Sequence, residues 1–114
     1  MSSPITTHVL DTSMGRPGRG VPVQLEALGD DGIFREIARG TTNDDGRVPG
    51  LFEGGTLERR TYRIRFDLEA YFAKSQRASF YPEASIVFRI EAPAEHYHVP
   101  LLLSPFGYST YRGS

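Results

Sequence analysis

The stretch 60-RTYRIRFDL-68 alternates apolar with polar residues along most of its length. Side chains of an extended chain point to opposite faces in turn, so this stretch has one apolar and one charged face. The residues of the apolar face are Tyr62, Ile64, Phe66 and Leu68. Such alternation, with aromatic and β-branched residues, is typical of a strand that is buried on one side only.

Two further stretches, 20-GVPVQLEAL-28 and 85-SIVFRIEA-92, show the same period of two. Less regular strand candidates are residues 5–12, 33–40, 96–104 and 107–112. The turn signals between them are 15-GRPG-18, 30-DDG-32, 43-NDDG-46, 54-GG-55 and 105-PFG-107. The pair Asp31–Gly32 predicts a hairpin. Seven or eight short strands at this spacing predict an all-β sandwich, with residues 1–114 forming a single domain.

One segment, 67-DLEAYFAKSQ-76, breaks the alternation. Leu68, Tyr71 and Phe72 recur in it at helical spacing, and Asp67 is a suitable N-cap residue. The segment therefore predicts a helix of about two turns laid against the edge of the sandwich.

The composition excludes several classes of protein. A chain of 114 residues with 39% hydrophobic residues can build one core, and a net charge of -1 argues against nucleic-acid binding. The absence of Cys excludes disulfides and thiolate chemistry, and three His residues make the common zinc sites a poor fit. No apolar run reaches the ~18 residues of a membrane span, and no signal sequence is visible. The sequence therefore predicts a cytoplasmic protein with no metal, nucleic-acid or membrane partner.

A few polar residues lie where packing alone does not require them. Alternation places His8 on the same strand face as Thr6 and Leu10, although a strand His is more often a surface or core residue than a catalyst. Arg47 directly follows the turn 43-NDDG-46 and is one of twelve arginines. The last residues, 108–114, carry two tyrosines and an arginine, which favours a docked rather than a frayed chain end.

In 96-HYHVPLLLS-104, His96 and His98 fall on one face of the predicted strand. His98 is the better catalytic candidate, because it lies nearer the apolar run. Pro100 cannot donate a ladder hydrogen bond, so we expect an edge or a bulge near it. No phosphate-binding, nucleotide-binding, serine-hydrolase or zinc-protease motif is present. The residues by themselves therefore leave the function open.

The same residues carry a resemblance to a known family. The stretches are 5-ITTHVLDTSMGRPG-18, 43-NDDGRVPGL-51, 80-FYPEASIVF-88 and 96-HYHVPLLLSPFGYSTYRGS-114. Together they resemble the 5-hydroxyisourate hydrolase family, the transthyretin-related proteins of purine catabolism. The terminal YRGS is the stretch that separates these hydrolases from transthyretin carriers.

The resemblance implies a transthyretin-like sandwich of two four-stranded sheets with one short helix. It also implies a homotetramer with active sites in a central channel, and no cofactor. The implied catalytic residues are His8, Arg47, His98 and Ser114. The implied substrate-binding residues are Arg47, Tyr111, Arg112 and Gly113. His96 has no catalytic counterpart in the resemblance.

The implied reaction opens the six-membered ring of 5-hydroxyisourate by hydrolysis, giving 2-oxo-4-hydroxy-4-carboxy-5-ureidoimidazoline. His98 or His8 would be the general base, with Arg47 stabilising the oxyanion. Arg112 would clamp the substrate or hold the terminal peptide, and Ser114 would act by its hydroxyl or its carboxylate. The alternatives are a small-ligand carrier of the transthyretin kind and an adhesion or carbohydrate-binding sandwich.

Overall fold

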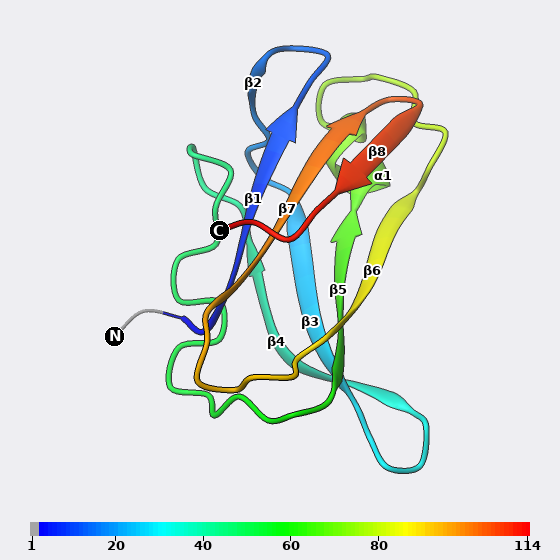
Figure 1. Cartoon of the computed structure of the whole chain (residues 1–114). Coiled ribbons are helices and arrows are strands. Elements are labelled where there is room, and N and C mark those ends of the chain that lie inside the picture. The colour runs from blue at the N-terminus through cyan, green and yellow to red at the C-terminus, as the bar shows by residue number, and fades with distance from the viewer. Residues whose placement is uncertain (1–2) are drawn as a thin grey trace.

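The computed structural model describes residues 3–114, which form eight strands and one short helix. In chain order these are β1 (Ile5–Asp11), β2 (Arg16–Pro17), β3 (Pro22–Leu28), β4 (Phe34–Thr41), β5 (Thr61–Asp67), α1 (Leu68–Ala73), β6 (Glu83–Arg89), β7 (Tyr97–Ser104) and β8 (Gly107–Thr110). One sheet has the order β2-β1-β7-β8 and the other β4-β3-β5-β6 (Figure 1). The predicted sandwich of two four-stranded sheets with one short helix is therefore confirmed.

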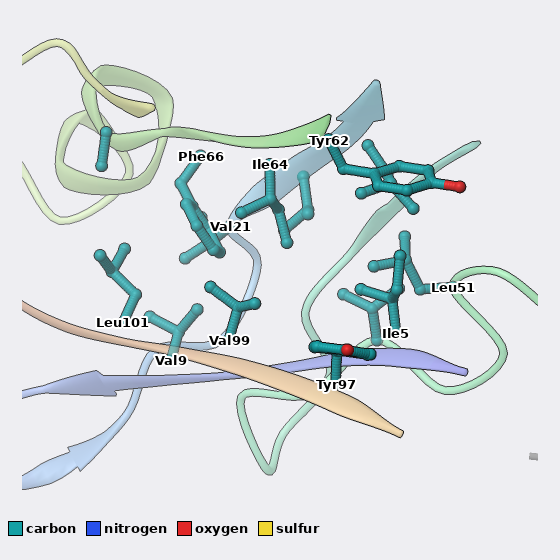
Figure 2. Close-up of a cluster of buried hydrophobic side chains, with 14 of the residues drawn as sticks. Ile5, Val9, Val21, Leu51, Tyr62, Ile64, Phe66, Tyr97, Val99 and Leu101 are labelled. Atoms are coloured by element: carbon teal, nitrogen blue, oxygen red, sulfur yellow. The ribbon is translucent and has the colours of Figure 1, made fainter. Parts of the chain in front are cut away.

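The hydrophobic core lies between the two sheets. In Figure 2, side chains from β1 and β7 point across this layer toward side chains from β5. Among them are Ile5, Val9, Val99, Leu101, Ile64 and Phe66, all of them buried. Burial of each such side chain contributes about 1.5–3 kcal/mol to the hydrophobic stabilisation of the fold. Buried and half-buried residues alternate along β1, so the opposite face of this strand remains available for other contacts.

The local predictions hold for the most regular segments. The stretches 20–28 and 60–68 contain β3 and β5, and 85–92 overlaps β6, which begins earlier, at Glu83, and ends at Arg89. The hairpin between β3 and β4 turns at Gly32, whose φ is +80°. Helix α1 begins after Asp67, whose carboxylate accepts a hydrogen bond of 2.9 Å from the amide of Ala70. No helix among residues 3–114 is long and apolar enough to cross a membrane.

The segment 15-GRPG-18 is not only a turn, as its composition predicts. Within it, Arg16 and Pro17 pair antiparallel with Asp11 and Leu10 as strand β2. A two-residue strand carries no alternation that a sequence could reveal. Pro17 is tolerated there because β2 is the edge strand of its sheet, where a missing N–H leaves no ladder bond broken.

The expectation of an edge or a bulge at Pro100 is wrong. Strand β7 lies inside its sheet, between β1 and β8, and it pairs in parallel with β1 without a register shift. The effect of Pro100 is instead a gap in the pairing with β8, which ends at Thr110 rather than at the predicted residue 112. The Thr110 hydroxyl donates 2.7 Å to the Pro100 carbonyl, and pairing resumes in the same register where His98 meets Gly113.

Candidate functional site

Strand β1 places His8 beside Arg47. His8 is half-buried and lies on the face of β1 that points away from the core. The segment after β4 approaches it, since the amide of Val9 donates 2.8 Å to the carbonyl of Gly46 and an isolated antiparallel bridge joins His8 to Arg47. Two cationic or potentially cationic side chains, separated by a long stretch of sequence, are thereby brought together.

The turn before Arg47 is fixed by Asn43 and Gly46. The Asn43 side-chain oxygen accepts hydrogen bonds from the amides of Asp45, at 2.9 Å, and Arg47, at 3.1 Å. Gly46 has a φ of +76°, and a Cβ at this position would clash with the Val9 carbonyl. Only glycine therefore suits both the turn and the close approach to β1, and this approach sets the position of Arg47.

His98 is held by its neighbour across the sheet. Thr6 lies directly opposite His98 in the parallel pairing of β1 with β7, and its Oγ1 is 2.8 Å from His98 Nδ1. The same Oγ1 is 2.9 Å from Nε2 of His96, which is exposed. With Nδ1 engaged by Thr6, Nε2 of His98 is the nitrogen that remains for chemistry.

The C-terminal segment lies across His98. Figure 1 shows it passing from β8 over β7 and β1 toward the loop that follows β4. The amide of Gly113 donates 2.8 Å to the His98 carbonyl, and a Cβ on Gly113 would clash with His98 Cδ2. The absence of a side chain at Gly113 therefore lets the backbone lie against the imidazole and brings Ser114 to the site.

These segments surround an open hollow of about 530 Å³. Its lining comprises Ser3, Thr6, Thr7, Arg47, Val48, Pro49, Gly50, His96, His98 and Ser114. Among these described residues none is Asp or Glu, whereas three have basic side chains. The hollow therefore suits an anionic or oxygen-rich ligand.

Burial and nearby positive charge lower the pKa of His98 below its usual 6.5. Partial burial is the larger cause, followed by the charges of Arg47, His8 and His96. The imidazole is therefore neutral at pH 7 and ready to accept a proton, as a general base must be.

Tyr111 and Arg112 do not reach this hollow. The Arg112 guanidinium bonds Glu95 at 3.0 Å and lies 4.3 Å from the centre of the Tyr97 ring, so its contacts are those of an anchor for the terminal segment. Tyr111 is exposed, and both residues line a second hollow, of about 510 Å³, that reaches toward β6. His98 lines both hollows.

The structure thus brings together Arg47, His98, Gly113 and Ser114, with His8 alongside, and it separates Tyr111 and Arg112 from them. The residues that the sequence did not single out for the site are Thr6 and His96. Their signal was present, because alternation placed Thr6 with His8 and His96 with His98. No group of three His, Cys, Asp or Glu side chains within residues 3–114 could hold a metal ion.

Comparison with known proteins shows which family the chain belongs to. The sequence profile of the HIUase/Transthyretin family matches residues 5–113. The chain belongs to the HIUase/Transthyretin family. It is 45% identical to the 5-hydroxyisourate hydrolase of Mus musculus over 114 residues, covering 99% of this chain and 97% of that protein.

Solved structures of both branches of the family resemble this one. The 5-hydroxyisourate hydrolase of Klebsiella pneumoniae superposes with a TM-score of 0.83 at 37% identity, covering 96% of this chain and 92% of that one. Sea bream transthyretin, solved in complex with thyroxine, superposes with a TM-score of 0.90 at 31% identity, covering 96% and 94%. The fold alone therefore does not separate hydrolase from carrier, and the site residues must do so.

Proposed function

We propose that this member of the HIUase/Transthyretin family is an enzyme that hydrolyses 5-hydroxyisourate to 2-oxo-4-hydroxy-4-carboxy-5-ureidoimidazoline in urate degradation. The observation that carries the proposal is the convergence of Arg47 and Ser114 on His98, with His8 beside Arg47. The relatives named 5-hydroxyisourate hydrolase support the choice of substrate.

In the proposed mechanism, Nε2 of His98 removes a proton from a water molecule that attacks the ring carbonyl. Arg47 stabilises the negative charge that develops on the carbonyl oxygen, because its guanidinium is a permanent cation with several donors. The bond from the carbonyl carbon to the ring nitrogen then breaks, and that nitrogen receives a proton from His98 or His8. Ser114 would hydrogen-bond the substrate or an imidazole.

The lowered pKa of His98 supports its assignment as the base. At neutral pH the ring is unprotonated, and the same nearby cations that lower its pKa also favour an anionic substrate. His8 could exchange roles with His98, and the pH dependence of single variants distinguishes the two.

We keep Tyr111, Arg112 and Gly113 as proposed substrate-binding residues together with Arg47. The hollow around His98 lies open at the surface of one chain. We therefore also propose the homotetramer, in which neighbouring chains would enclose the site, and a cytoplasmic location. Substitution of Tyr111 by Phe tests its role, because a substrate contact requires a rise in KM. Light scattering coupled to size exclusion tests the tetramer.

The second candidate is a small-ligand carrier, which the close superposition on thyroxine-bound transthyretin favours. One experiment separates the two. Urate oxidase generates 5-hydroxyisourate in the cuvette, and the hydrolase shortens the decay of its near-ultraviolet absorbance. If 5-hydroxyisourate decays no faster with the protein than without it, the proposal that the protein is an enzyme is overturned.

A further inference from the structure

A single hydroxyl lies between two imidazole rings next to the site. Thr6 Oγ1 is 2.8 Å from His98 Nδ1 and 2.9 Å from His96 Nε2. A threonine hydroxyl has one proton and two lone pairs. If it donates to one ring, it must accept an N–H from the other for both contacts to be hydrogen bonds.

When both rings are neutral and the Thr6 proton lies between them, two arrangements connect the rings. In the first, His98 carries its proton on Nδ1 and donates to Thr6, which donates to Nε2 of His96; Nε2 of His98 is then a free lone pair. In the second, Thr6 donates to Nδ1 of His98, whose proton lies on Nε2, and Nε2 of His96 donates to Thr6. In a third, both rings donate to Thr6 and its own proton points elsewhere, so no proton can pass between the rings. Of the two arrangements that connect the rings, only the first leaves His98 able to act as a base toward the site.

The two rings differ in their access to solvent. His98 is half-buried under Gly113, whereas His96 is exposed at the start of β7. Thr6 is β-branched and lies in a strand, so its χ1 is restricted and its hydroxyl stays in place between the rings. A path of two short hydrogen bonds therefore leads from the half-buried imidazole to bulk water.

We propose that Thr6 and His96 form a proton relay that sets the tautomer of His98 and carries its excess proton to solvent. The role rests on the proposed hydrolase function. In it, Thr6 and His96 are positioning and relay residues, since they act through His98 and do not touch the reacting atoms.

The proton balance of the relay is complete. His98 starts with a proton on Nδ1 and takes a second one, from water, on Nε2. The Nδ1 proton passes to Thr6 Oγ1, the Thr6 hydroxyl proton passes to Nε2 of His96, and His96 releases its Nδ1 proton to water. Both rings then carry their proton on Nε2. When Nε2 of His98 gives its proton to the leaving ring nitrogen, His96 takes a proton from water on Nδ1 and the same transfers run in reverse, which restores the first arrangement. The net proton of the hydrolysis comes from the new carboxylic acid, which ionises at neutral pH, so the relay itself takes up as many protons as it releases in one turnover.

The charged and titratable groups that face His98 are Arg47, His8 and His96. Each of them would be cationic or potentially cationic, so all three oppose a long-lived imidazolium at His98. Because the imidazolium form of His98 is disfavoured, a hydrogen-bonded path that removes its second proton would speed the reaction.

The test begins with the free protein and needs no activity. Nitrogen-15 NMR of the histidine rings reports which nitrogen carries the proton. At pH 7.5 we expect the proton of His98 on Nδ1, with Nε2 of His96 unprotonated. Protonation of Nε2 of His96, with or without Nδ1 of His98, or of neither nitrogen, overturns the relay.

Variants then test the coupling. In Thr6→Val the Nδ1 proton of His98 loses its acceptor, so the Nδ1–H population of His98 should fall and its titration should become independent of His96. Thr6→Ser keeps the hydroxyl and should behave as the wild type. Thr12→Val is the matched control, because the hydroxyl of Thr12, the residue after β1, also donates to β7, at 3.0 Å to the Leu103 carbonyl and away from both rings.

Turnover supplies the second readout. We expect Thr6→Val to lower kcat about tenfold with KM unchanged, a part of the 10²–10⁴ that acid–base catalysis contributes. His96→Gln should be slow in dilute buffer and regain turnover when imidazole buffer is added at constant pH. Wild-type kcat in Thr6→Val, or no buffer rescue of His96→Gln, overturns the relay. If the wild-type protein leaves 5-hydroxyisourate decay unchanged, the proposed function fails, whereas the tautomer measurement still decides the hydrogen-bond coupling.

Discussion

Strand β1 carries two polar clusters that are built in opposite ways. On its core-facing side, the carboxylate of Asp11 is fully buried and accepts hydrogen bonds from Ser13, Tyr71 at 2.6 Å and Arg77 at 2.8 Å. On its outer side, His8 and Thr6 meet Arg47 and His98, and no Asp or Glu side chain among the described residues lines the hollow there.

Both clusters lower the pKa of their central group, but by different causes and with different results for its charge. Burial alone would raise the pKa of Asp11, but the hydrogen bonds from Ser13, Tyr71 and Arg77 outweigh it and lower this pKa. At His98, burial and like charges act together to lower the pKa and leave the ring neutral. Paired charges thus join β1 to the segment around α1, whereas the cations around His98 have no carboxylate side chain beside them in the described lining of the hollow and hold its ring neutral.

The largest expected effect is the loss of the base. We expect His98→Asn to lower kcat about 10³-fold, because acid–base groups contribute about 10²–10⁴. Its folding stability should not fall. Since the folded pKa of His98 is lowered, the wild-type protein loses stability as pH falls below about 6.5, and the variant should lose less. Urate oxidase-coupled absorbance and thermal unfolding at pH 5.5 and 7.5 measure both; a loss of turnover below tenfold contradicts the role.

Arg47→Ala tests the role of the Arg47 guanidinium beside His98. We expect kcat to fall about 10²–10³-fold, the usual cost of losing one oxyanion donor. The pKa of His98 should also rise, because the Arg47 charge helps to lower it. The acid limb of kcat/KM, which we expect below pH 6.5 in the wild type, should therefore move to higher pH. Arg47→Lys is the matched control, since it keeps the charge and loses the planar fork. An unmoved limb in Arg47→Ala contradicts the electrostatic link.

Asp11→Asn tests the paired cluster. Removing one charge of a buried ion pair costs about 3 kcal/mol of unfolding free energy, since Arg77 keeps its charge. The stabilisation from the lowered pKa of Asp11 is present above about pH 4 and is lost as pH falls through its folded value. The difference between variant and wild type should therefore shrink in acid. Urea unfolding measures it, and Arg39→Ala, in an exposed pair with Glu36, should leave the midpoint nearly unchanged.

Gly113→Ala tests the terminal segment. The added Cβ would clash with Cδ2 of His98, so the segment must shift, and displacement by about 1 Å can cost 10² in rate. We expect kcat to fall by up to that factor with little change in the melting temperature. Gly107→Ala is a suitable comparison, because a Cβ there meets only the Ser104 hydroxyl, at 3.8 Å. Equal activity in both variants contradicts the close packing on His98.

Most of the fold could be predicted from local patterns. Alternation gave β3, β5 and β6, and the N-cap at Asp67 gave the start of α1. Strand β2 is not predictable from the sequence because two residues carry no period. The expectation of an edge or a bulge near Pro100 is wrong because no local pattern reveals that only the pairing of β7 with β8 is interrupted there.

The site was predictable only in part. The resemblance picked out His8, Arg47 and His98, and the structure brings them together. Alternation put Thr6 and His96 on the correct strand faces, but their meeting depends on the parallel register Thr6↔His98, which no local pattern encodes. The separation of Arg112 from the hollow depends likewise on its contacts with Glu95 and Tyr97, which form only in the folded chain.

The pairing of β1 with β7 has a consequence for synthesis of the protein. Thr6 and His98 are 92 positions apart, so the hydrogen bond between them closes almost the whole chain into one loop. During translation, the strand that bears His98 emerges after the other sheet has been made, and Gly113 and Ser114 follow it. A ribosome-bound chain that ends at β6 therefore lacks His96 and His98, the two histidine partners of Thr6. Under the proposed mechanism, activity can begin only when translation has passed β7, so turnover would report that β7 has paired with β1.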